Sequence, residues 1–132
     1  MDIKTGDTAH VVGGSFPSVS TDGRHLLVNR QSVYQVDLTT HEQISVYRAA
    51  LEYDWSPDGD TFLVGNFYEK SLQQKIYKVR KGGGWSEYFT NGESPRYSPR
   101  GDRIVLTRIS SDRKEHLWLV DRDGRNAKQL TR

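Results

Sequence analysis

The segment from Asp54 to Asp60 reads DWSPDGD and brings three carboxylates and a serine hydroxyl together within a few residues. Acid–base and nucleophilic catalysis use such groups, so the segment could form an active site. Its S-x-x-G core, however, occurs three times, beginning at Ser20, Ser56 and Ser98. An active site does not need three copies, whereas Pro, Asp and Gly suit successive positions of a tight turn. We therefore interpret the segment as a turn.

Two other motifs would suit ligand binding if their spacing were right. Asp121 to Asn126 reads DRDGRN and resembles the start of a calcium loop, but its glycine is fourth where the EF-hand has it sixth. Gly82 to Gly84 could surround a phosphate, yet no Lys-Ser or Lys-Thr pair follows, as a P-loop requires. Both segments are interpreted as hairpin turns.

The histidines and cysteines form no convergent set. His10, His25, His41 and His116 fall at unrelated positions of the repeat described below, whereas a metal site or a catalytic triad needs its histidines together. The chain has no cysteine, which excludes disulfides and thiolate metal sites. We predict no catalytic residue, no metal site and no cofactor in this chain.

Length and composition predict one folded domain. The chain has 132 residues, of which 34% are hydrophobic and 27% charged. No apolar run approaches the roughly 20 residues of a membrane span, and the N-terminus lacks the apolar core of a signal peptide. The net charge is +2, and the basic excess lies after residue 95, where acidic residues interrupt it. A nucleic-acid surface is therefore not expected.

The three S-x-x-G motifs belong to a longer repeat, with spacings of 36 and 42 residues. An apolar run follows each motif: LLV, FLV and IVL. A second run comes later in each repeat: VYQVD, IYKVR and LWLVD. A short strand can be placed before each motif and another at the end of each repeat. Because Gly or Pro interrupts every candidate helix, the pattern predicts an all-β protein.

The repeats predict a partial β-propeller with blades of four antiparallel strands. The runs VYQVD, IYKVR and LWLVD are apolar without alternation, which is typical of strands buried on both faces. Blades stacked face to face bury their inner strands in this way. We assign residues 1–132 to a single partial propeller domain, with an orphan outer strand at 1–13 and blades at 14–48, 49–90 and 91–132.

The sequence PRYSPRGDRIVLTR at 95–108, followed by LWLVDRDGRNAKQLT at 117–131, resembles the TolB-type repeat, a WD-like propeller family. The resemblance extends well over residues 51–65 and more loosely over 16–48. Thr21 and Arg100 stand where the family pattern has Pro and Asp. Similar repeats occur in periplasmic TolB, in propeller domains of prolyl-oligopeptidase-like and tricorn-type peptidases, and in some polysaccharide lyases. The resemblance thus implies a fold and several possible functions.

A non-catalytic module that binds a protein or peptide is the function we expect from this resemblance. The alternatives are an accessory propeller domain of a prolyl-oligopeptidase-like or tricorn-like peptidase, or a propeller polysaccharide lyase. A periplasmic location follows if the resemblance extends to a longer parent protein. Three blades cannot close a ring, so we expect either part of a larger propeller or self-association as a dimer.

The connectors between the second and third strands of each repeat vary most in sequence. Such loops gather on one face of a propeller and often bind partners. We expect partner contacts from seven residues of these loops: Tyr68, Glu69, Lys70, Arg108, Asp112, Arg113 and Lys114. Asp54 is a further candidate, because it aligns with Ser18 and Arg96 on the innermost strands, where a central channel would meet a ligand.

Overall fold

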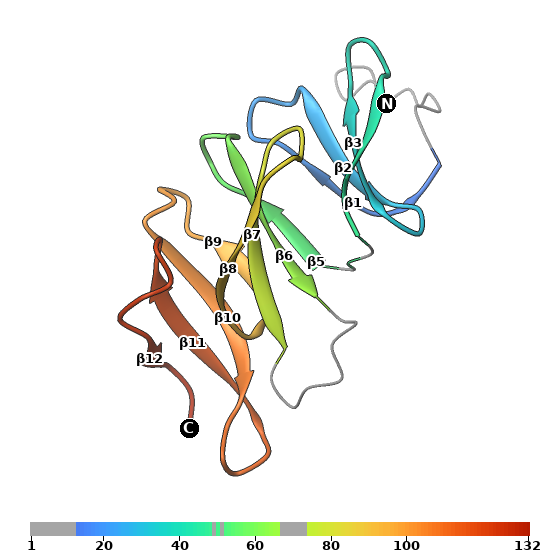
Figure 1. Ribbon diagram of the computed structural model, residues 1–132. Coiled ribbons are helices and arrows are strands. Elements are labelled where there is room, and N and C mark those ends of the chain that lie inside the picture. Colours follow the sequence, from blue (N-terminus) through green and yellow to red (C-terminus); the bar gives the residue numbers. More distant parts are fainter. Residues whose placement is uncertain (1–12, 49, 51, 67–73) are drawn as a thin grey trace, which may run out of the picture.

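The computed structural model describes residues 13–48, 50, 52–66 and 74–132. Every regular element in these ranges is a strand, and the strands form three four-stranded antiparallel sheets (Figure 1). The predicted all-β fold with four-stranded antiparallel blades is confirmed. The orphan strand expected at 1–13 lies outside the described residues, apart from Gly13.

Each sheet is one blade, with its strands paired in chain order from the innermost to the outermost. Blade 1 comprises β1 (Ser15–Val19), β2 (His25–Asn29), β3 (Val33–Asp37) and β4 (Gln43–Tyr47). Blade 2 comprises β5 (Glu52–Trp55), β6 (Thr61–Asn66), β7 (Lys75–Arg80) and β8 (Ser86–Asn91). Blade 3 comprises β9 (Glu93–Tyr97), β10 (Arg103–Ile109), β11 (Glu115–Asp121) and β12 (Lys128–Gln129). The last strand, β12, is therefore shorter than the last strands of the other two blades.

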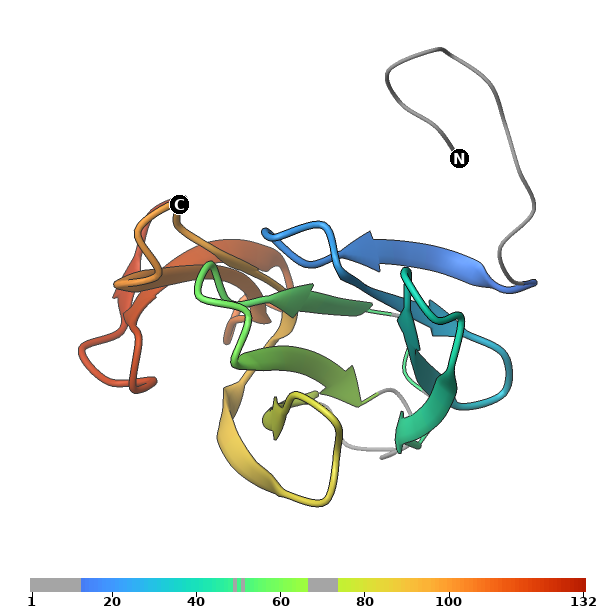
Figure 2. The same cartoon turned by 90° about the horizontal axis from the view of Figure 1, so that it is seen from above.

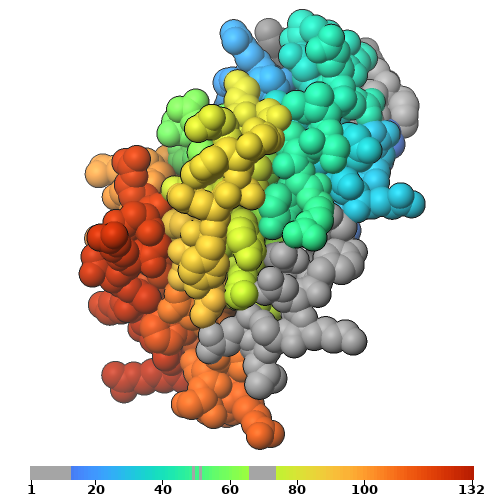
Figure 3. Space-filling model, viewed as in Figure 1, coloured from blue at the N-terminus to red at the C-terminus, as the bar shows by residue number. Residues whose placement is uncertain are grey.

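The blades lie side by side in chain order, with blade 2 between the other two (Figures 1 and 2). The innermost strand of the middle blade, β5, contacts β1 on one side and β9 on the other. The space-filling view shows β8 lying directly against blade 3 (Figure 3). Neighbouring blades thus meet along broad faces, as stacked sheets do.

The S-x-x-G segments form the turns between the first and second strands, as predicted. In blade 2, Gly59 N–H donates to Ser56 O at 2.9 Å, and the equivalent bond closes the turns of blades 1 and 3. Gly59 has φ 76°, a left-handed conformation that glycine adopts without strain. The Ser56 hydroxyl donates to the Asp58 carboxylate and accepts from Thr61 N–H at 3.2 Å. The serine hydroxyl and the aspartate carboxylate therefore form hydrogen bonds within the turn.

Blade 3 shows how the turn tolerates the departure at Arg100. This arginine stands where the other copies have an aspartate, and Ser98 Oγ donates instead to Asp102 Oδ1 at 2.8 Å. Ser98 Oγ also accepts from Arg103 N–H at 3.2 Å, as in the other blades. Asp102, two residues further along the chain, thus accepts the serine hydrogen bond that the aspartate accepts in the other turns.

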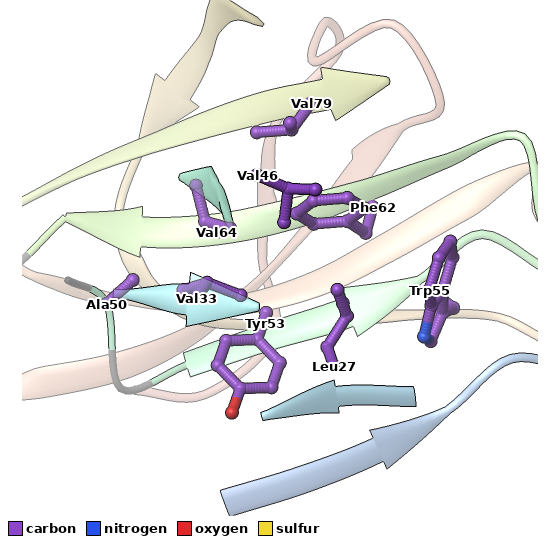
Figure 4. Packing of buried hydrophobic residues seen from close by; sticks show 9 residues of the cluster. All are labelled: Leu27, Val33, Val46, Ala50, Tyr53, Trp55, Phe62, Val64 and Val79. Atoms are coloured by element: carbon purple, nitrogen blue, oxygen red, sulfur yellow. The ribbon is translucent and has the colours of Figure 1, made fainter. Parts of the chain in front are cut away.

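Two hydrophobic clusters fill the spaces between the blades. The first joins blades 1 and 2 (Figure 4) and consists of Leu27, Val33, Val46, Ala50, Tyr53, Trp55, Phe62, Val64 and Val79. The second joins blades 2 and 3 and consists of Leu63, Ile76, Ile104, Leu106 and Val120. Phe62 and Leu63 are consecutive on β6 and belong to different clusters. Both faces of the middle strands are therefore buried, which explains their runs without polar alternation.

Candidate functional site

Alternate side chains of β5, the innermost strand of blade 2, form hydrogen bonds with β1 on one side and with β9 on the other. On one side, the Tyr53 hydroxyl donates to the carbonyl of Phe16, and Trp55 Nε1 donates to Ser18 O at 3.1 Å. Figure 4 shows the Tyr53 hydroxyl pointing away from the cluster toward the blue strands of blade 1. Burial raises the pKa of Tyr53 to about 12. This side of β5 is therefore a structural contact with blade 1.

The other side of β5 presents two carboxylates to blade 3. Glu52 accepts from Ser94 N–H at 2.6 Å and from Ser94 Oγ at 2.7 Å. Asp54 Oδ2 accepts from Tyr97 N–H at 2.8 Å. Side chains at i and i+2 share one face of a strand, which is why both acids reach β9. The two acids bind backbone and hydroxyl donors of the next blade.

A hollow of about 290 Å³ opens beside these contacts. It brings together Ser18, Asp54 and Arg96, the three residues that the repeats align on the innermost strands. Burial raises the pKa of Asp54, opposed by the hydrogen bond from Tyr97 N–H and by the charge of Arg96. Asp54 thus links blades 2 and 3 through a backbone hydrogen bond, and its contact with a partner stays a prediction.

A second hollow, of about 300 Å³, lies between blades 2 and 3 and contains Arg108. Its walls come from the end of β8, the link to β9 and the end of β10. The lining residues are Gln74, Tyr88, Thr90, Asn91, Gly92, Glu93, Thr107, Arg108 and Ile109. We name it the Arg108 hollow. Arg108, one of the residues expected to contact a partner, lines this hollow; the structure places it on β10 rather than in the predicted loop.

Arg108 is partly buried and held in a fixed position. Its Nε donates to Asn91 O at 2.9 Å, and its Nη2 donates to Thr90 Oγ1 at 2.8 Å. The guanidinium carbon lies 5.1 Å from the centroid of the Trp118 ring, a cation–π contact. Burial lowers the pKa of Arg108, which nevertheless stays charged at neutral pH. The arginine is therefore an ordered cation at the wall of the hollow.

The link between β8 and β9 forms the wall beside Arg108, because Gly92 lets it approach β10 closely. A Cβ at Gly92 would lie 2.7 Å from Leu106 Cδ1 and 2.8 Å from Thr107 O. Gly92 also has φ 141°, a backbone conformation that residues other than glycine rarely adopt. Gly92 N–H donates to Gln74 O at 2.8 Å, which ties the link to the start of β7. The backbone of this link thus sets the shape of the hollow.

The remaining predicted contact residues lie elsewhere or outside the described part. Asp112, Arg113 and Lys114 form the exposed turn between β10 and β11. Asp112 accepts from Lys114 N–H at 2.9 Å, and its Oδ2 lies 2.9 Å from Nε2 of the buried His116. The hydrogen bond with His116 lowers the pKa of Asp112. The last three, Tyr68, Glu69 and Lys70, lie outside the described residues.

Most residues that line the Arg108 hollow were not predicted from the sequence. Tyr88, Thr90 and Glu93 belong to the end of one blade and the start of the next, a segment that the repeats mark only as strand. The signal that could have found them is Gly92, which aligns with Gly14, a second glycine that directly precedes an innermost strand and has φ 155°. Burial and the charges of Glu115 and Glu52 raise the pKa of Glu93, an acid at the rim of this hollow.

Within the described ranges, no three His, Asp or Glu side chains gather as metal ligands would. None of the described elements is an apolar helix of membrane-spanning length. In the same ranges, Gln74 Oε1 is buried beside the Arg108 hollow without a hydrogen-bond partner.

No family model matches the sequence. Several solved structures are similar in fold. TolB from Acinetobacter baumannii has 23% sequence identity and a TM-score of 0.78, with 98% of this chain and 36% of that chain covered. The β-propeller domain of the trilobed protease from Pyrococcus furiosus has 13% identity and a TM-score of 0.68, with 89% and 42% covered.

A third similar structure is an acylaminoacyl peptidase in complex with Z-Gly-Gly-Phe-chloromethyl ketone. It has 16% identity and a TM-score of 0.63, with 89% of this chain and 25% of that chain covered. The chain thus spans less than half the length of each of these three proteins. At such identities the likeness concerns the fold, and the chain has the fold of part of a β-propeller.

Proposed function

We propose that this chain is a non-catalytic, TolB-like propeller module that binds a peptide or an extended protein segment at the Arg108 hollow. The observation that carries the proposal is the hollow itself. It combines an ordered cation, a carboxylate, hydroxyl and amide side chains, and the exposed apolar surface of Ile109. Concave sites with a few fixed polar groups beside apolar surface are typical of binding sites.

The position of the hollow also favours a peptide ligand. Its walls come from strand ends and from the link between two blades, where loops present side chains to a partner. Tyr88, whose side chain is 52% exposed, offers an aromatic surface at the opening. Aromatic residues and arginine are the side chains that contribute most at protein interfaces. These features support recognition of a chain segment that lies across the opening.

Selection of peptides from a random phage library on the immobilised chain tests this function. We expect enrichment of a peptide family, and we expect Ile109→Ser to weaken its binding by roughly tenfold because apolar contact is lost. Ile44→Ser is the matched control, since Ile44 is 45% exposed and Ile109 is 42% exposed. Selected peptides that bind Ile109→Ser and Ile44→Ser equally well would contradict a site at this hollow.

An accessory domain of a peptidase is the second candidate, supported by the likeness to acylaminoacyl peptidase. In that case the parent gene should encode, beside this segment, a G-x-S-x-G motif between a strand and a helix. Reading the complete gene decides between the two candidates. A parent protein that consists of propeller repeats without such a motif favours the binding module.

A further inference from the structure

The geometry points to a carboxylate group as the ligand that Arg108 recognises in its hollow, either a peptide C-terminus or an Asp or Glu side chain. This inference rests on the proposed function, since it names the chemistry of the segment that the hollow binds. It specifies a carboxylate as the ligand group and Arg108 as the residue that recognises it.

The first support is the charge state of Arg108. No carboxylate of the described residues lies within ion-pair distance of its guanidinium. The partners of this side chain are neutral: a backbone carbonyl, a threonine hydroxyl and an indole ring. A partly buried cation without a counter-ion interacts strongly with an incoming anion, because solvent screening is weaker there than at an open surface.

The second support is the hydrogen-bonding geometry of the guanidinium. A guanidinium has five N–H donors, and Nε and Nη2 make the two bonds described above. The remaining donors include both hydrogens of Nη1. The cation–π contact with the Trp118 ring and the two hydrogen bonds hold the guanidinium in place. A preorganised arginine of this kind suits a carboxylate, which accepts two parallel hydrogen bonds.

The third support is Glu93, which limits the kind of anion that the hollow can bind. Glu93 lines the same hollow, and its carboxylate repels a ligand that carries several negative charges. Peptide N–H groups, by contrast, can donate hydrogen bonds to the Glu93 carboxylate. A peptide with a single carboxylate therefore offers an acceptor to Arg108 and N–H donors to Glu93, whereas a phosphate dianion or a nucleic-acid backbone adds further negative charge beside Glu93.

Titration of the ¹⁵N-labelled chain with short peptides, followed by NMR, tests the inference. The probes are acetyl-Ala-Ala-Ala with a free C-terminus, acetyl-Ala-Glu-Ala-amide, acetyl-Ala-Gln-Ala-amide and acetyl-Ala-Ala-Ala-amide. We expect saturable shifts of the Arg108 Nε–H and of the amides of Gly92 and Glu93 with one or both carboxylate peptides. The neutral peptides should need at least about tenfold higher concentration. The first two probes distinguish a C-terminal carboxylate from a side-chain carboxylate.

Arg108→Gln should abolish the preference for carboxylate peptides. Arg103→Gln is the matched control, because Arg103 begins the same strand, is exposed, and lies at the other end of β10. The contrast between charged and neutral peptides needs no variant, so it stays decisive even if Arg108→Gln perturbs the link. Equal binding of charged and neutral peptides at the hollow would overturn the carboxylate inference and leave the proposed function standing. If neither these peptides nor library-selected ones bind, both are overturned.

Discussion

Tyr53 shows how one side chain connects two blades. Its ring belongs to the first hydrophobic cluster, and its hydroxyl donates to a carbonyl of β1. We expect Tyr53→Phe to lower the free energy of unfolding by about 1 kcal/mol, because a partly buried hydrogen bond is lost. Urea denaturation measures the change. Tyr34→Phe is the control, since the Tyr34 hydroxyl makes no hydrogen bond to any of the residues that the structure describes. Equal losses for the two variants would contradict a stabilising bond from Tyr53.

The acid of the S-x-x-G turn makes stability depend on pH. Hydrogen bonds from Ser56 and from Asp60 N–H lower the pKa of Asp58 from 3.8. A carboxyl whose pKa is lower in the folded state stabilises the fold above its unfolded pKa, and this contribution disappears as the pH falls through the folded pKa. The stability difference between wild type and Asp58→Asn should therefore be largest at neutral pH and shrink below about pH 4.

Urea midpoints of wild type and Asp58→Asn, measured across the acid range, check this sign. Asp60→Asn is the control, because it removes a neighbouring carboxylate that makes no bond to the turn serine. A difference that grows toward acid pH would be the wrong sign for a stabilising carboxylate.

At the scale of elements, the link between β8 and β9 determines the Arg108 hollow. We expect Gly92→Ala to destabilise the chain by about 1–3 kcal/mol, because its Cβ would overlap Leu106 and the backbone of β10. Binding of a selected peptide should weaken as well, since the same link forms a wall of the hollow. Gly13→Ala is the control, because a Cβ there would have no atom of the described residues beyond its chain neighbours within 4 Å. Thermal unfolding that is unchanged by Gly92→Ala would contradict the close approach.

The strands were predictable from the sequence because burial on both faces leaves a visible pattern. The runs FLV and IYKVR became the central strands β6 and β7, and the recurrence of Ser56-Pro57-Asp58-Gly59 correctly indicated turns. In blade 3, Arg100 replaces the aspartate of the turn, and Asp102 accepts the serine hydrogen bond instead. This was not predictable, since it depends on the direction in which the Asp102 carboxylate points.

The candidate site was predictable only in part. Arg108 was identified as part of a predicted variable connector, whereas it lies on β10, and its hydrogen-bond partners come from the end of the preceding blade. Thr90 and Glu93 carry no periodic signal, because the path of a link depends on the packing of two blades rather than on local propensity. Asp54 was placed correctly on an innermost strand, yet its bond to Tyr97 N–H could not be read from alignment of the repeats.

At the scale of the whole molecule, blade 3 carries an apolar face on the side away from blade 2. In blade 2, Leu63, Ile76 and Phe89 pack against blade 3. By repeat position, their counterparts are Val105, Leu117 and Leu130, and the last two are 40% and 47% exposed. A further blade, from the same parent protein or from a second copy, is the partner that such a face suits.

We therefore expect the isolated chain to self-associate at high concentration, with a mass approaching twice 15.1 kDa in sedimentation experiments. Leu117→Glu should keep it at 15.1 kDa, because a charge in the apolar face opposes burial. Ile44→Glu, on the outermost strand of blade 1, serves as the control. A wild-type chain that stays monomeric at every concentration would contradict a role of this face in association.

The central claim is that the partner binds at the Arg108 hollow between blades 2 and 3. Mapping the amide shifts caused by a library-selected peptide on the ¹⁵N-labelled chain tests this claim most directly. We expect the largest shifts on residues 90–93 and 107–109, with Tyr88 at the edge of the affected surface. Shifts centred instead on the hollow around Asp54, or spread evenly over the blades, would contradict it.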